Sequence, residues 1–281
     1  MKRIFILLLI SALSFCHSAI AQVEYTGQFR MLFGVNMGEA AQPIEMSMRI
    51  SYLKGIAMID NIAIPEMFSK GVSTNALKVI IEQKNKVMTM ATITPEGKKI
   101  KSVTKLDKSN EKYNPSKMKE VFEGLKETMN KQGVTFEWIN TNETKKIDGY
   151  TAYKTVLSSN KVDVIFWLTK DVKNLSFKNM QGNMTEEQKI NKADIVRMLE
   201  DVFGKTPVSF TNSFPILIEG DMKDPALKSK LSSFYIKFFS FSDKVTASDF
   251  NLVGYKEVEK DAFQNELQGK GGSNNTTPIE D

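Results

Sequence analysis

The sequence predicts an α+β fold: a curved, mostly antiparallel sheet, forming a half-barrel, with two main amphipathic helices packed on one face. Three observations lead to this prediction. Segments in which apolar and polar residues alternate outnumber segments with helical periodicity, most connections are short enough for hairpins, and only two stretches repeat every three to four residues.

The predicted strands combine period-two alternation with flanking turn residues. In the second of them, Met46, Met48 and Ile50 share one parity, whereas Arg49 and Ser51 take the other. The expected strands span residues 23–35, 46–52, 56–59, 77–82, 87–93, 99–103, 135–139, 150–157, 162–169, 214–219 and 233–241.

Two segments predict helices. Residues 114–133 begin with an Asn-Pro pair suited to a helix start, place apolar residues along one helical face and end at a glycine. Residues 185–204 begin with a Thr-x-x-Gln capping box and also end at a glycine. Both stretches therefore predict amphipathic helices that cover the sheet.

Residues 1–21 have the layout of a secretory signal peptide: a basic pair, a short apolar run and small residues before the expected cleavage after Ala21. The apolar run is shorter than the roughly 20 residues that span a bilayer. We expect export to the periplasm or the outer-membrane periphery of a Gram-negative-type envelope. The alternative is acylation of Cys16, although Phe15 occupies a position where a small residue is normally required.

After the signal peptide, residues 22–262 are expected to form a single domain. The last segment, 263–281, is rich in glycine, asparagine and threonine and predicts a disordered tail.

Cleavage would remove Cys16 and His17, which are the only cysteine and the only histidine of the chain. Catalysis by a Ser-His-Asp or Cys-His arrangement requires these residue types, and so do the usual zinc sites. The sequence therefore predicts a non-catalytic protein with no catalytic residues, no metal site and no cofactor.

The net charge is +5, and removal of residues 1–21 leaves 36 basic against 33 acidic residues, or +3. Lysines are spread along the chain rather than clustered, which favours a solvated surface over a nucleic-acid groove. Contact with the surface of an anionic membrane stays compatible with this charge.

Several motifs stand in a characteristic order along the chain. They are Met-x-Met-x-Ile-x-Tyr-x-Lys-Gly at 46–55, the stretch from Glu143 to Lys154 that contains Asp148-Gly149-Tyr150, Phe-Trp-Leu-Thr-Lys-Asp at 166–171, and Asp-Phe-Asn-Leu-x-Gly-Tyr at 249–255. In this order they resemble exported envelope domains of unknown function whose fold is similar to the lipoprotein carriers LolA and LolB. The resemblance covers residues 23–258 and implies a half-barrel that is open along one side, without implying an activity. Within it, Gly149 is suited to a positive φ angle, with Tyr150 entering the next strand.

Methionines occur in two pairs that share a strand face: Met46 with Met48, and Met88 with Met90. Because methionine adapts to irregular shapes, one interpretation is a flexible apolar site for a lipid or an acyl chain. The alternatives are packing in an ordinary core and binding of a soft metal ion such as Cu(I).

Aromatic residues supply the other candidates for ligand contact. Trp167 is either a core anchor or a ligand contact. In the segment 233–241, Phe234, Ile236 and Phe238 share one parity, but two further phenylalanines break it. A strand buried on both faces, a bulge or an exposed binding edge would each explain this pattern.

Carboxylates are the remaining candidates for acid–base chemistry. Glu186 and Glu187 lie in the first turn of a predicted helix, where negative charge complements the helix dipole, and Asp221, Asp224 and Asp243 lie in predicted loops. The sequence thus favours an exported, non-catalytic protein that binds a hydrophobic ligand. The alternatives are a module that docks to an envelope protein and a carboxylate-based hydrolase.

Overall fold

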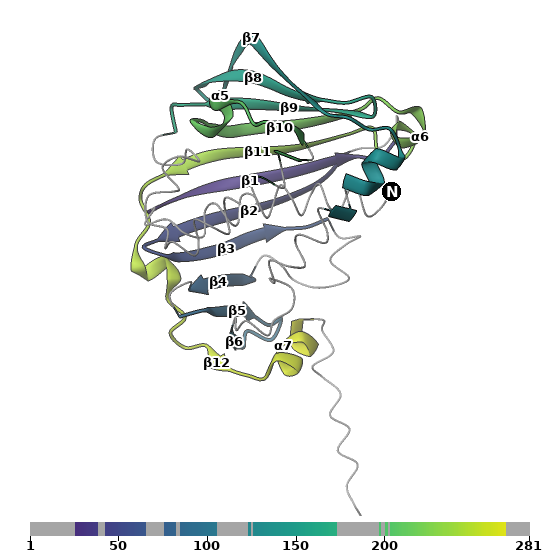
Figure 1. Cartoon of the computed structure of the whole chain (residues 1–281). Coiled ribbons are helices and arrows are strands. Elements are labelled where there is room, and N and C mark those ends of the chain that lie inside the picture. Colours follow the sequence, from purple (N-terminus) through teal and green to yellow (C-terminus); the bar gives the residue numbers. More distant parts are fainter. Residues whose placement is uncertain are drawn as a thin grey trace, which may run out of the picture.

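The computed structural model describes residues 26–38, 43–65, 76–82, 85–105, 123–124, 126–172, 197, 200–201 and 203–267. Within them, twelve strands form one sheet in the order β12-β6-β5-β4-β3-β2-β1-β11-β10-β9-β8-β7 (Figure 1). The strands are β1 (Gly27–Asn36), β2 (Ile44–Leu53), β3 (Ile56–Ala63), β4 (Lys78–Glu82), β5 (Val87–Ile93), β6 (Lys99–Lys105), β7 (Glu137–Ile147), β8 (Tyr150–Ser158), β9 (Val162–Thr169), β10 (Phe214–Met222), β11 (Ser233–Ser242) and β12 (Lys256–Glu257).

The predicted fold class is wrong in its share of helix and in its layers. The described part of the chain is 54% strand and 17% helix. Its helices with complete bounds are short: α5 (Val208–Thr211), α6 (Pro225–Lys228) and α7 (Lys260–Leu267), with a 3₁₀ turn, η3 (Ala247–Phe250). The fold is a mixed twelve-stranded sheet rather than a half-barrel under two main amphipathic helices.

Most of the predicted helices 114–133 and 185–204 lies outside the described residues. The described end of the first is helical as far as Lys131, and Met129 packs there in a small cluster with Val134, Phe136 and Phe203. The main described core is built instead by side chains from neighbouring strands. Helical periodicity predicts a helix, but it does not predict how much of the core the sheet supplies by itself.

All but one of the neighbouring strand pairs are antiparallel. The exception is β12, which pairs in parallel with β6 and makes the sheet mixed. The two edges of the sheet are β12, which has two residues, and β7, whose side chains are mostly exposed and which contains an irregularity between Asn140 and Thr144. A very short edge strand and a charged, irregular one both disfavour pairing with other chains.

A bulge in β11 explains the broken parity of the aromatic segment. The register between β11 and β1 shifts within residues 28–30, and Ser240 has a φ angle of 54°. As a result, the rings of Phe238 and Phe241 both contact Phe29, at centroid distances of 5.7 and 5.8 Å. Because β11 lies inside the sheet between β1 and β10, the bulge accounts for the pattern and an exposed edge does not.

The turn between β7 and β8 confirms the local prediction made for Asp148-Gly149-Tyr150. Asp148 and Gly149 have φ angles of 49° and 88°, and Ile147 pairs with Tyr150 on either side of them. Two consecutive positive φ angles define the two-residue hairpin turn that matches the twist of antiparallel strands.

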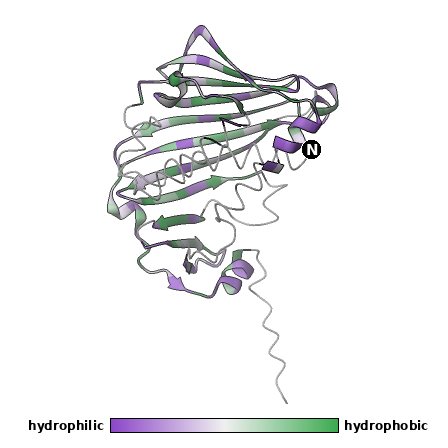
Figure 2. Ribbon diagram, viewed as in Figure 1, coloured by the Kyte–Doolittle hydropathy of each residue, from purple (hydrophilic) through white to green (hydrophobic). Residues whose placement is uncertain are grey.

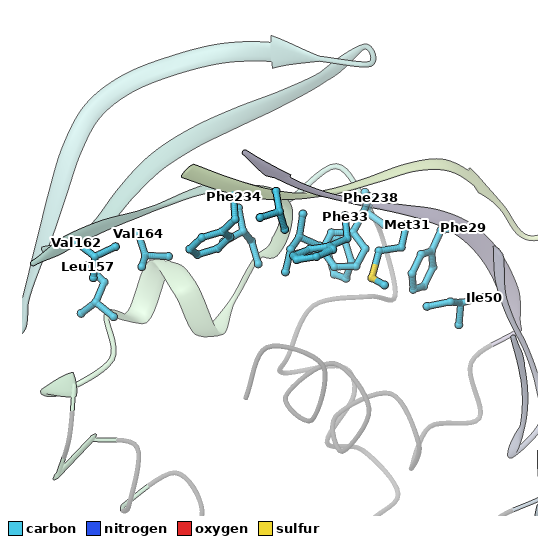
Figure 3. Packing of buried hydrophobic residues seen from close by; sticks show 14 of the residues in the cluster. Phe29, Met31, Phe33, Ile50, Leu157, Val162, Val164, Phe234 and Phe238 are labelled. Carbon is cyan, nitrogen blue, oxygen red and sulfur yellow. The ribbon is translucent and has the colours of Figure 1, made fainter. Parts of the chain in front are cut away.

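The main core lies on one face of the sheet. Figure 2 shows hydrophobic and hydrophilic residues alternating along the strands. In Figure 3 the labelled core side chains, from Leu157 and Val162 to Phe29 and Ile50, lie on the same side of the sheet. Several strands therefore contribute to one continuous apolar layer.

The C-terminal part returns to the β6 edge. After β11 the chain forms η3, pairs through β12 with β6, and ends its described part in α7. Residues 263–267 belong to α7 and Phe263 is fully buried, so these residues are not part of a disordered tail as predicted. The rest of the predicted tail, 268–281, and the predicted signal peptide, 1–21, lie outside the described residues.

Among the helices of the described residues, none has the length and apolar character needed to cross a membrane.

Candidate functional site

The cross-strand register assigns the central residues of nine strands to one of the two faces of the sheet. We call the face that carries Phe29 the apolar face. Its residues are Phe29, Met31, Phe33 and Val35 of β1; Ile44, Met46, Met48, Ile50 and Tyr52 of β2; Ala57 and Ile59 of β3; Val79 and Ile81 of β4; Met88, Met90 and Thr92 of β5; Ile100, Ser102 and Thr104 of β6; Phe234, Ile236 and Phe238 of β11; Ile218, Gly220 and Met222 of β10; and Val162, Val164 and Phe166 of β9.

None of these residues is charged. The charged residues of the same strands lie on the opposite face, where for example Arg49 of β2 pairs with Asp60 of β3. An isolated charge loses its hydration when it is buried against apolar side chains, at a large cost in free energy. The apolar face is therefore suited to contact uncharged, hydrophobic groups.

Burial divides the apolar face into two parts. Under β1, β9, β10 and β11 the side chains are buried almost completely, as Phe29, Ile236 and Val164 are. From β2 to β5 many are only half-buried, and we call these the methionine strip: Met46, Met48, Ile59, Val79, Ile81, Met88 and Met90. The strip continues the core layer sideways along the sheet.

Strand pairing sets the width of the methionine strip. Met46 and Met48 pair with Phe33 and Met31 of β1 and thus lie next to the closed core. The other methionine pair lies three strands away on β5, a distance of about 14 Å at the usual strand spacing. The four methionines therefore line two borders of one strip rather than a single compact centre.

The β4–β5 hairpin places the far border of the strip. Val79 pairs with Met90 and Ile81 with Met88, so each thioether lies opposite a β-branched side chain. Such pairs are favourable across antiparallel strands. Met88 and Met90 keep a flexible side chain at half-exposed positions, where they can adapt to a bound group.

Seven of the eight residues that the sequence proposes for ligand contact share the apolar face. Met46, Met48, Met88 and Met90 are half-buried in the methionine strip. The other three, Phe234, Ile236 and Phe238, are buried in the core layer.

Trp167, the eighth residue, lies on the opposite face. Its register partner is Leu217, it is 7% exposed, and it packs with Ile147, Ala152 and Ile216. The indole N–H donates a hydrogen bond to Glu219 Oε2 at 2.7 Å, and Lys145 Nζ lies 3.9 Å from the ring centroid. These contacts anchor a second, smaller core cluster.

Ile59, Val79 and Ile81 are strip residues that the sequence analysis did not propose. Each lies between the two methionine pairs, on β3 or β4. The signal was present for Val79 and Ile81, because a hairpin between residues 82 and 87 places them opposite Met90 and Met88. Ile59 needs the pairing of β3 with β4, which alternation within one strand does not predict.

The two methionine pairs do not support the Cu(I) alternative as a shared centre. Soft-metal binding needs several sulfur ligands around one point, but the two pairs are three strands apart. Among the described residues there is also no group of three or more His, Cys, Asp or Glu side chains able to hold a metal ion.

The carboxylates singled out from the sequence have structural contacts or exposed positions. Asp224 caps α6 through the Ala226 N–H and pairs with Lys161, whose hydrogen bond lowers the pKa of that carboxyl. Asp221 pairs in register with Asp163 of β9, and Lys223 Nζ lies 2.6 Å from Asp163 Oδ1. Asp243 is exposed, and Glu186 and Glu187 lie outside the described residues.

No protein-family model matches the chain, and no curated protein matches it either. Among solved structures, it is similar to PNGF-II with 11% identity and a TM-score of 0.31, over 87% of this chain and 34% of the other. It is also similar to a LolA superfamily protein from Nitrosomonas europaea, with 10% identity, a TM-score of 0.28 and coverage of 85% and 96%. A DUF1329 family protein from Desulfovibrio piger gives 12% identity, a TM-score of 0.25 and coverage of 85% and 92%.

The chain thus spans about a third of the length of PNGF-II and most of the length of the other two proteins. The resemblance to the lipoprotein-carrier fold, which the sequence motifs indicated, is confirmed as a general likeness of fold. At these TM-scores and identities, the likeness implies no ligand, partner or activity for this chain.

Proposed function

We propose that this chain is an exported, non-catalytic envelope protein that binds a hydrophobic ligand, such as an acyl chain, on the methionine strip. One observation carries the proposal. The apolar face has no charged residue from β9 to β6, and between β2 and β5 its apolar side chains are only half-buried.

The energetics of contact favour such a ligand. Removing apolar surface from water is worth about 25 cal/mol per Å², and a ligand on the strip would cover both its own chain and the half-buried side chains. Because no charged residue lies on the apolar face, a charged headgroup would stay outside the contact. The thioethers of Met46, Met48, Met88 and Met90 can adjust to different chain shapes.

Export rests on the sequence of residues 1–21. A periplasmic location would give the protein access to lipids and to other envelope components, and its small positive charge is compatible with brief contact to an anionic membrane surface.

The experiment is to purify the chain without its first 21 residues under native conditions, extract it for lipid mass spectrometry, and titrate the stripped protein with a fluorescent fatty acid. We expect a co-purified apolar molecule and saturable uptake of the probe. Absence of both, in a protein with a cooperative melting transition, would refute the proposal.

A matched pair of variants locates the site. Met48→Glu adds a charge on the apolar face, whereas Ser47→Glu adds the same charge one residue away on the opposite face. We expect Met48→Glu to weaken probe binding about tenfold or more, because the new carboxylate loses hydration on binding. Ser47→Glu should bind like the wild type, and equal losses in both variants would place the ligand elsewhere.

A further inference from the structure

Helix α7 lies against the sheet at the β6 end (Figure 1). It follows β12, which is held to β6 by parallel pairing and by the Val258 N–H, which donates to the Lys101 carbonyl at 2.9 Å. The helix has eight residues, too few for a stable isolated helix, so its position depends on packing.

Burial along β6 identifies the face that α7 covers. Ser102 and Ile100, on the apolar face, are 2% and 6% exposed, whereas Val103, on the opposite face, is 39% exposed. A helix packed on β6 must cover the buried side, so α7 lies on the apolar face. Ser102 pairs directly with Met90, so α7 lies beside the far border of the methionine strip.

Phe263 is the side chain that anchors α7. It is 0% exposed, and none of the other seven residues of the helix is fully buried. The methionine strip is therefore bounded on both sides: by the closed core under β1, and by the α7 anchor at β6.

We propose that Phe263 is the end-stop of the strip and sets the longest alkyl chain that binds with full contact. This inference rests on the proposed function and extends it from a ligand class to a rule of selection. The strip has a fixed width and its lining is uncharged. Chain length therefore governs affinity, and the charge of the headgroup has little influence.

The test uses displacement of a fluorescent fatty acid by a series of straight-chain fatty acids and by the corresponding fatty alcohols. For the wild type, we expect affinity to rise about fourfold per added methylene while the chain still gains contact, as expected for burial of one CH₂ group. Beyond a limiting length, affinity should stop rising. Acids and alcohols should share that limit.

Variants at position 263 should move the limit in opposite directions. Phe263→Ala and Phe263→Leu should shift it to longer chains, and Phe263→Trp to shorter ones. Undocking of α7 cannot produce a shorter limit, so the tryptophan variant separates an end-stop from simple loosening. Gln264→Ala, at an exposed position of the same helix, is the matched control and should keep the wild-type limit.

The possible failures are distinguishable. If the wild type binds the chains but all variants keep one limit, the end-stop is refuted and the proposed function stands. If the wild type binds no chain of any length, the proposed function itself fails. If Phe263→Ala loses its folding transition, the leucine and tryptophan variants decide.

Discussion

The ring of Tyr235 on β11 lies directly over Gly34 on β1. A Cβ atom at position 34 would come within 2.2 Å of Tyr235 Cζ, so glycine is required there for the ring to cross the strand. The Tyr235 hydroxyl donates a hydrogen bond to Glu45 of β2, so one side chain connects three neighbouring strands at the centre of the sheet.

Gly34→Ala should therefore lower the free energy of unfolding by about 1–3 kcal/mol, as expected for overpacking. Urea denaturation measures the change. Combining it with Tyr235→Ala should cost less than the sum of the two single effects, because the clash is removed. Strict additivity would contradict the close approach of the ring to Gly34.

Tyr235 also predicts a dependence of stability on pH. Burial, followed by the hydrogen bond to Glu45, raises its pKa from 10.0 to about 12. A pKa raised in the folded state means that the phenol contributes stability that is complete below pH 10 and is lost as the pH rises through 12. Tyr235→Phe should remove this contribution, so denaturation between pH 9 and 12 should fall less steeply than in the wild type; identical slopes would contradict it.

The ion pair between Arg49 and Asp60 is a second test of the central sheet. Asp60 is 3% exposed, and Arg49 Nε donates to its Oδ1 at 2.8 Å. Arg49→Met should cost about 3–5 kcal/mol, because it leaves a buried carboxylate without its partner. Adding Asp60→Leu should recover much of the loss in chemical denaturation. A double variant no more stable than Arg49→Met would show that the buried charge is not the cause.

Trp167 supplies a prediction that separates stability from binding. Trp167→Phe removes the indole donor to Glu219 and weakens the contact with Lys145. We expect a loss of about 1–2 kcal/mol in the free energy of unfolding. Probe affinity should stay unchanged, because Trp167 lies on the face opposite the methionine strip. A clear fall in affinity at full folding would place the ligand on the wrong face in our account.

Local patterns in the sequence predict many strands closely. The expected strands 87–93 and 162–169 coincide with β5 and β9. By contrast, β7 runs from Glu137 to Ile147 although only 135–139 was expected. Its second half, on an exposed edge, has polar and charged residues at both parities. An edge strand that buries little leaves no alternation to detect.

The site could be predicted only in part for a related reason. Alternation within β2 and β5 is enough to group each methionine pair, but placing both pairs on one face requires the pairing of four strands. In β9, apolar residues occupy both parities, so Trp167 could be assigned to either face until its neighbours Lys154 and Leu217 are known. Similarly, Phe263 lies in a short helix whose burial depends on β6.

The most direct test of the account compares two charge insertions on neighbouring strands. Met90→Glu places a carboxylate in the methionine strip, and Val103→Glu places one on the opposite face of β6, where the side chain is 39% exposed. With both variants folded, titration with a fluorescent fatty acid should give about tenfold or weaker binding for Met90→Glu and wild-type binding for Val103→Glu. Wild-type affinity in Met90→Glu, or an equal loss in both, would contradict ligand binding on the methionine strip.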